Sequence, residues 1–205
     1  MSQLFASLQK TLPQHGLSRL AGRLAASETP WLKNLLIKHF ATIYKVDLAE
    51  AQRSNLQDYV SFNDFFTRAL RPGVRPVVQD PSMLACPADG AVSQAGKIDR
   101  GQLMQAKGHS YSINSLAGDL ARGFERGTFC TIYLAPHDYH RVHLPCDGTL
   151  THTLAVPGEL FSVNAVTENA VDGLFARNER LVCRFETEFG PMLVVLVGAM
   201  LVSSM

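Results

Sequence analysis

Ser61-Phe-Asn-Asp-Phe-Phe-Thr-Arg-Ala-Leu-Arg-Pro-Gly73 is the stretch at which this sequence changes character. Its first residues have the pattern of a helix capping box, in which the Ser61 hydroxyl accepts a free backbone N–H of the first turn. Arg71-Pro72-Gly73 then ends the helix, because proline and glycine both disfavour its continuation. Helical periodicity precedes the stretch and strand-like runs follow it. The sequence therefore predicts an α+β fold, with N-terminal amphipathic helices followed by a β-rich body.

Two weaker helices are predicted on either side of a stronger one. Leucines recur at helical spacing over residues 3–26, and Pro13 and Gly16 are expected to break this first helix. Another helix is expected over residues 47–59. Between them, Thr29 can cap a helix that has Pro30 in its first turn. This central helix carries a wide apolar face made of Trp31, Leu32, Leu35, Leu36, Phe40, Ile43 and Tyr44.

Charge is unevenly distributed along the chain. Residues 1–46 hold six Lys or Arg and one acid, for a net charge of +5, whereas residues 47–205 have a net charge of −4. Two interpretations remain open for the basic helices: a pair packed on its own core, or an interfacial membrane anchor in which Lys33, Lys38 and Lys45 meet lipid headgroups. Nucleic acid is less favoured, because the basic residues alternate with leucine and not with exposed aromatic residues.

The β-rich body consists of short apolar runs separated by Gly, Pro and Asp-Gly turns. Strands are predicted over residues 91–95, 128–134, 149–156, 180–186 and 192–202. The last run is almost wholly apolar, which is typical of a strand buried on both faces. Only three residues follow it, so we expect that a neighbouring piece of the protein is missing from this sequence.

The overall composition narrows the class of protein. The 205 residues are 46% hydrophobic and 18% charged, as in a globular protein. The four cysteines form no CxxC pair, which favours a reducing compartment. No apolar run reaches the roughly 18 residues of a membrane-spanning helix. Arg19 and Arg23 interrupt the only candidate secretory segment.

One segment, Tyr133-Leu-Ala-Pro-His-Asp-Tyr-His-Arg-Val-His-Leu-Pro-Cys-Asp-Gly148, gathers three histidines at intervals of three residues. His137, His140 and His143 could form a zinc site, a surface loop without chemistry, or a general acid–base site. The flanking prolines disfavour a helix, so convergence on one metal is not favoured, and we expect a turn between Pro136 and Pro145. Nearby carboxylates are Asp138, Asp147 and, in the separate block Cys86-Pro-Ala-Asp-Gly90, Asp89.

Seven ordered blocks carry a resemblance to a known family. The blocks are Ser61–Gly73, Pro87–Gly90, Lys107–Ile113, Asp138–His143, Gly158–Asn164, Phe175–Arg180 and Glu188–Pro191. Over essentially its whole length the chain resembles the bacterial phosphatidylserine decarboxylase proenzymes. The resemblance implies a self-processed enzyme of phospholipid biosynthesis that converts phosphatidylserine to phosphatidylethanolamine and CO2.

The resemblance also implies a cofactor and roles for individual residues. Such proenzymes cut themselves at a Gly–Ser bond, and the serine becomes a pyruvoyl group on a small α chain that stays bound to the larger chain. Asp89 and His143 match the residues that activate this serine, and His140 matches the histidine of the decarboxylation step. Phe161 and Asn164 are candidates for lining the headgroup pocket. No metal is expected, and His137 is the histidine least expected to take part in the chemistry of the site.

The chemistry of the residues agrees with these roles. Self-cleavage needs a nucleophile, a base and an orienting carboxylate. Decarboxylation needs a carbonyl that takes up electrons and an acid that protonates the resulting carbon. Two reactions would thus explain two histidines.

The expected organisation is a helical membrane-associating region over residues 1–73 and a β-rich catalytic domain over residues 74–205 that is incomplete at its C-terminus. Because the sequence has no Leu-Gly-Ser motif, the pyruvoyl serine is expected beyond its end, and this chain alone should be inactive. The resemblance implies a peripheral protein on the cytoplasmic face of a bacterial inner membrane. A second copy of the chain, forming a homodimer, is a further candidate partner. The alternatives are a histidine-ligated zinc hydrolase and a non-catalytic membrane-docking module.

Overall fold

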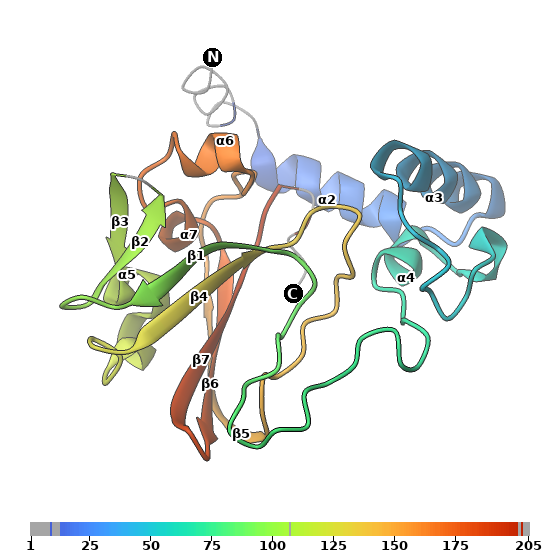
Figure 1. The fold of residues 1–205 in the computed structure, drawn as a ribbon. Helices are drawn as coiled ribbons and strands as arrows, with labels where there is room; N and C mark the ends of the chain where they lie inside the picture. The colour runs from blue at the N-terminus through green and yellow to red at the C-terminus, as the bar shows by residue number, and fades with distance from the viewer. Residues whose placement is uncertain (1–8, 10–12, 107, 201, 203–205) are drawn as a thin grey trace. The chain divides into compact units, whose positions relative to one another are not determined.

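The structure is a computed structural model that describes residues 9, 13–106, 108–200 and 202 (Figure 1). Helices α2 (Gln14–Ala25), α3 (Pro30–Tyr44) and α4 (Phe62–Phe66) precede all the strands that the structure describes. Antiparallel sheets dominate the rest of the chain, so the predicted α+β fold with helices first is confirmed. Among the described residues, no helix combines the length and the hydropathy needed to cross a bilayer.

The N-terminal helices match the predictions in part. α3 begins at Pro30 as predicted, although the Thr29 side chain makes no capping hydrogen bond. α2 begins directly after Pro13 and continues through Gly16, so the predicted break at Gly16 is wrong. The part of this first helix predicted over residues 3–8 and 10–12 lies outside the described residues.

The helix predicted over residues 47–59 is wrong, because only a short 3-10 turn, η1 (Leu56–Asp58), forms there. The side chain of Asp47 accepts the N–H of Ala49, and that of Asn55 accepts the N–H of Gln57. Such turns, in which a short polar side chain binds the backbone two residues on, compete with helix formation. These turns replace the single helix that was predicted over residues 47–59.

α4 is held by its predicted cap. The Ser61 hydroxyl accepts the N–H of Asp64 at 3.2 Å, and the Asp64 carboxylate accepts the N–H of Val60 at 3.0 Å. Arg53 makes a bidentate ion pair with the same carboxylate, which lowers the pKa of Asp64. The helix is only five residues long, so it ends before Arg71-Pro72-Gly73.

The described chain forms two compact units of interleaved segments. One unit comprises residues 21–91 and 134–146, and the other comprises the described residues within 1–20, 92–133 and 147–205. The core of the first consists of Ile37, Val46, Tyr59 and Phe65. The predicted functional division at residue 73 stays a prediction.

Lys33 corrects one detail of the charge interpretation. Its side chain is buried in the first unit, and its Nζ donates to the backbone carbonyls of Gln57 and Tyr59. Because the helix predicted over residues 47–59 does not form, these carbonyls have no helical partner, and the Lys33 ammonium group binds them instead. It is therefore not available to lipid headgroups.

Three small sheets form the second unit. β1 (Ala91–Lys97) pairs with β4 (Thr128–Tyr133), and β2 (Gln102–Ala106) forms an antiparallel hairpin with β3 (His109–Ser112). The largest sheet has the antiparallel order β5 (Gly148–Val156), β6 (Arg180–Thr187) and β7 (Gly190–Val197) (Figure 1). The short helical elements are α5 (Ile113–Ala117), η2 (Gly118–Ala121), α6 (Ala165–Glu168) and α7 (Leu174–Arg177).

Strands form in all five predicted runs, but the last differs from its prediction. β7 ends at Val197, and most of its side chains are half-buried, so burial on both faces is wrong. Within the described residues β7 lies at one edge of its sheet, with β6 as its neighbour. An edge position explains why an apolar strand is only partly covered.

The interior of the second unit uses buried amides to join its segments. Gln105 bonds to the backbone of Glu168, Val171 and Leu174, and Asn178 bonds to both backbone groups of Phe161. Gly158 lets its own backbone pass close to the backbone of Arg177, because a Cβ at position 158 would lie 2.3 Å from the Arg177 carbonyl oxygen.

Candidate active site

The histidine segment lies against the Asp89 block in the first unit. The Ala85 N–H donates to the Pro145 carbonyl at 2.8 Å, and the His143 N–H donates to the Pro87 carbonyl at 2.7 Å. These two bonds pair residues 85–87 with residues 143–145 in antiparallel fashion. Backbone pairing thus brings His143 and the Pro87–Gly90 block onto neighbouring segments.

A turn begins the histidine segment. The Asp138 N–H donates to the Ala135 carbonyl at 2.9 Å, and the Asp138 carboxylate accepts the Ala135 N–H at 2.6 Å. The turn is formed at Pro136 and His137, and the chain is irregular from there to Pro145. The expected turn is therefore present but occupies only the start of the predicted interval.

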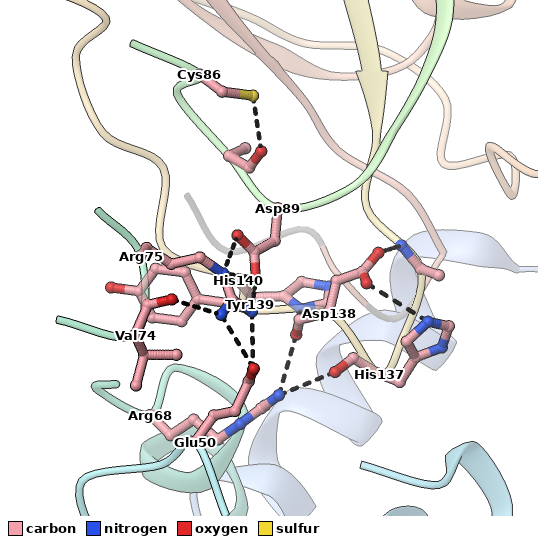
Figure 2. Close-up of polar contacts among 12 residues, drawn as sticks. Glu50, Arg68, Val74, Arg75, Cys86, Asp89, His137, Asp138, Tyr139 and His140 are labelled. Atoms are coloured by element: carbon pink, nitrogen blue, oxygen red, sulfur yellow. Dashed lines mark hydrogen bonds and ion pairs between the residues drawn. The ribbon is translucent and has the colours of Figure 1, made fainter. Parts of the chain in front are cut away.

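His140 is held in one orientation by the backbone of this turn. Its Nδ1 lies 2.9 Å from the Asp138 carbonyl oxygen (Figure 2), and its ring packs against Phe66 with centroids 4.0 Å apart. A carbonyl only accepts hydrogen bonds, so Nδ1 carries a hydrogen and Nε2 remains the reactive nitrogen. Burial lowers the pKa of His140 below its ordinary value of 6.5. The neutral form is thereby favoured near pH 7.

His143 has an aromatic partner. Its Nε2 lies 3.1 Å from the Tyr139 hydroxyl, and the two rings stack with centroids 5.7 Å apart at 18°. This contact comes from four residues earlier on the same segment, so it depends on the local turn. The ring of His143 is thus oriented by Tyr139 in this structure.

Asp89 is held by an arginine clamp (Figure 2). Arg75 donates from Nε and Nη2 to the Asp89 carboxylate at 2.7–3.0 Å, and from Nη1 and Nη2 to Glu50 at 3.1 and 2.8 Å. The paired carboxylates raise the pKa of Arg75, and its hydrogen bonds lower the pKa of Glu50. Asp89 and His143 therefore lie on adjacent segments but have different side-chain partners, and their joint role stays a prediction.

The three histidines do not form a metal site in the described part of the chain. The His137 Nε2 lies 3.4 Å from the Asp138 carboxylate, His140 binds a backbone carbonyl and His143 binds Tyr139. Among all described residues, no three His, Cys, Asp or Glu side chains are grouped as metal ligands. The ligand geometry needed by a zinc hydrolase is thus not formed by these histidines.

Phe161 and Asn164 belong to the other compact unit. Phe161 is fully buried in its core, beneath the Arg177 guanidinium. The Asn164 side chain caps α6 by accepting the N–H of Thr167. Packing and capping give both residues structural roles, and their contact with a substrate headgroup stays a prediction.

Sequence reasoning missed four residues that surround the predicted groups: Glu50, Arg68, Arg75 and Tyr139. The hydrogen bonds that join Arg75 to Asp89 and Glu50, and Arg68 to the histidine segment, span between 14 and 70 positions of the chain. The signal for Arg68 was its place in the block that ends at Gly73. Nothing in the local sequence distinguishes Arg75 or Glu50 from ordinary surface charges.

Comparison with known proteins then identifies the family. The family model described as Phosphatidylserine decarboxylase matches residues 62–205, and a second, described only as PSD, matches residues 4–45. A phosphatidylserine decarboxylase proenzyme of Acinetobacter baumannii is 58% identical over 203 residues, covering 98% of this chain and 72% of that protein. The chain belongs to the phosphatidylserine decarboxylase family.

Other members of the decarboxylase family are similar to the chain over comparable lengths. Proenzymes of the same name from Shewanella putrefaciens and Pseudomonas aeruginosa are each 56% identical, covering 100% and 98% of this chain and 72% and 71% of their own lengths. The decarboxylase match over residues 62–205 includes Asp89, His140 and His143 but not Glu50. These matches confirm the family predicted from the ordered blocks and do not favour the zinc hydrolase or the docking module.

Proposed function

We propose that this chain supplies the larger part of a self-cleaving, pyruvoyl-dependent enzyme that decarboxylates phosphatidylserine to phosphatidylethanolamine. The observation that carries the proposal is 58% identity, across 98% of the chain, to a protein named as the proenzyme of that activity. The pyruvoyl group would arise from a serine beyond the end of this sequence, on a small α chain of the same precursor. Residues 74–205 would be catalytic and residues 1–73 would associate with the membrane.

His140 has the properties that a pyruvoyl enzyme requires of its proton carrier. A pyruvoyl group, when present, would supply a sink for the electron pair released as CO2 leaves the substrate. The hydrogen bond from Nδ1 to Asp138 leaves His140 Nε2 as the position for proton exchange. Because burial lowers its pKa, Nε2 can accept a proton from the substrate's ammonium group. The same proton then goes to the carbon that has lost CO2.

His143 and Asp89 would serve self-cleavage. His143 would act as the base that removes the proton from the serine hydroxyl, and Asp89 would orient it. A carboxylate has about four acceptor positions, so Asp89 can receive a hydrogen bond from His143 while Arg75 still binds it. Arg75 would hold this carboxylate fixed in direction.

The decarboxylase activity is tested directly on the purified full-length protein. Vesicles of phosphatidylserine labelled at the serine carboxyl should release labelled CO2 and accumulate phosphatidylethanolamine in equal amounts. Loss of the lipid headgroup without CO2 would overturn the proposal and favour the hydrolase.

α3 supports a peripheral association with a membrane, which we propose to be the cytoplasmic face of a bacterial inner membrane. Trp31, Leu35 and Ile43 expose 69%, 59% and 55% of their surfaces on this helix. Lys38 and Lys45 are also exposed, so they can meet anionic headgroups such as phosphatidylserine. An apolar strip with cations beside it is typical of interfacial helices.

Replacing Leu35 with aspartate is expected to weaken binding of the full-length protein to phosphatidylserine vesicles by about tenfold or more, because a buried Leu contributes roughly 1.5–3 kcal/mol. Vesicle flotation measures the bound fraction. Val77→Asp is the matched control, since Val77 is 65% exposed but lies outside α3. Equal losses in the two variants would contradict the role of α3.

Two further assignments remain predictions. A homodimer would appear in sedimentation velocity as a species of twice the protomer mass. Contact of Phe161 and Asn164 with the headgroup would appear as a raised KM in Asn164→Ser, which keeps a capping hydroxyl.

A further inference from the structure

Arg68 is a buried cation with few partners. It follows α4, and 3% of its surface is exposed. Its Nη2 donates to the carbonyls of His137 and Asp138 at 2.9 and 3.3 Å (Figure 2). Its Nε and Nη1 are buried without a hydrogen-bond partner among the described residues. Burial lowers the pKa of Arg68, so this guanidinium is retained at an energetic cost.

The Asp138 carbonyl connects Arg68 to His140. Its oxygen accepts the longer hydrogen bond from Arg68 Nη2 and the 2.9 Å hydrogen bond from His140 Nδ1. Arg68 also holds the preceding carbonyl, that of His137. The guanidinium therefore fixes the two peptide groups that determine where the Nδ1 acceptor lies.

Several charged groups act on His140. Burial is the largest cause of its lowered pKa; the hydrogen bond to Asp138 raises this pKa, and the positive charge of Arg68 lowers it. The Asp138 carboxylate raises the same pKa, and His137 lowers it. Arg68 is thus the permanent cation that opposes the carboxylate of Asp138.

We propose that Arg68 is a positioning residue for decarboxylation, which holds the Asp138 carbonyl against His140 Nδ1 and keeps Nε2 without a proton at neutral pH. The proposal rests on the role of His140 in the proposed function and adds a residue that sets its tautomer and working pH range. Arg68 itself need not touch the substrate.

A purely structural tie would have a different signature, and the chain offers a control for it. The Arg141 Nε donates to the Thr67 carbonyl at 2.8 Å and so joins the same two segments. Arg141 is exposed, whereas the main groups that shift the pKa of His140 are the Asp138 backbone, Arg68, the Asp138 carboxylate and His137. Arg141→Gln therefore loosens the segments while these main groups around His140 stay in place.

The test follows the His140 imidazole by NMR titration in the full-length protein, with His140→Asn used to assign its signal. Arg68→Gln should raise the pH at which His140 titrates, whereas Arg68→Lys, which keeps the charge, and Arg141→Gln should change it little. A glutamine amide can still donate to the Asp138 carbonyl, so Arg68→Gln removes the charge while His140 keeps its acceptor. The acidic limb of CO2 release should therefore move to higher pH in Arg68→Gln.

Self-cleavage seen on a gel serves as the folding control for each variant. An unchanged His140 titration in folded Arg68→Gln, or an equal change in Arg141→Gln, would overturn the proposal. If Arg68→Gln does not fold, the wild-type protein still decides, because nitrogen chemical shifts showing hydrogen on Nε2 and not on Nδ1 would also overturn it. A wild-type protein that titrates as expected but releases no CO2 would refute the proposed function alone.

Discussion

Replacing His143 with alanine in the full-length proenzyme is expected to leave the chain uncut. Self-cleavage requires a base that takes the serine proton, and removing one member of such a set lowers the rate by about 10,000-fold or more. The His143 backbone is bound to Pro87, two residues before Asp89, so Asp89→Ala should have the same effect. Electrophoresis of freshly expressed protein measures the fraction of uncut chain.

The matched control for this prediction is His137→Ala. His137 lies on the same segment, but its Nε2 lies 3.4 Å from the Asp138 carboxylate and not beside Asp89 or His143 in any contact of the described residues. This variant should cleave normally. Cleavage of His143→Ala at the wild-type rate would show that another group activates the serine.

Replacing His140 with alanine should separate the two reactions. The variant should still cut itself, because His143 and Asp89 remain, but its release of CO2 should fall by about 100- to 10,000-fold, the usual contribution of a positioned acid–base group. Gel electrophoresis and CO2 release from the same preparation measure both reactions. An uncut His140→Ala chain would contradict the division of roles between the two histidines.

The sequence predicted elements whose signals are local. α3 was predicted from a proline in its first turn and from its apolar periodicity. β5 and β6 were predicted from apolar runs between turns. The β2–β3 hairpin was not predicted from the sequence, because its strands contain polar residues such as Gln102, Gln105 and His109. Gln105 is buried there only because its amide finds backbone partners 63 to 69 residues away.

The site was predictable to the same extent. Motif blocks gave Asp89, His140 and His143 as candidates, and the prolines predicted a turn between Pro136 and Pro145. The partners of these residues were not predictable, because the Arg75 clamp and the Arg68 contacts depend on tertiary packing. Lys33 shows the same limit: its position on α3 suggested a surface charge, whereas backbone carbonyls of Gln57 and Tyr59 bind it in the interior.

In the proposed function, this chain positions groups around a pyruvoyl carbonyl carried by a small chain of the same precursor. Borohydride reduction of the full-length, cleaved enzyme in the presence of phosphatidylserine tests it most directly, because it makes the bond between carbonyl carbon and lipid amine permanent. Mass spectrometry should find the lipid attached to the N-terminus of the small chain and none on residues 1–205. An absence of any adduct, or an adduct on a residue of this chain, would rule out a pyruvoyl carbonyl on the small chain as the group that binds the lipid amine.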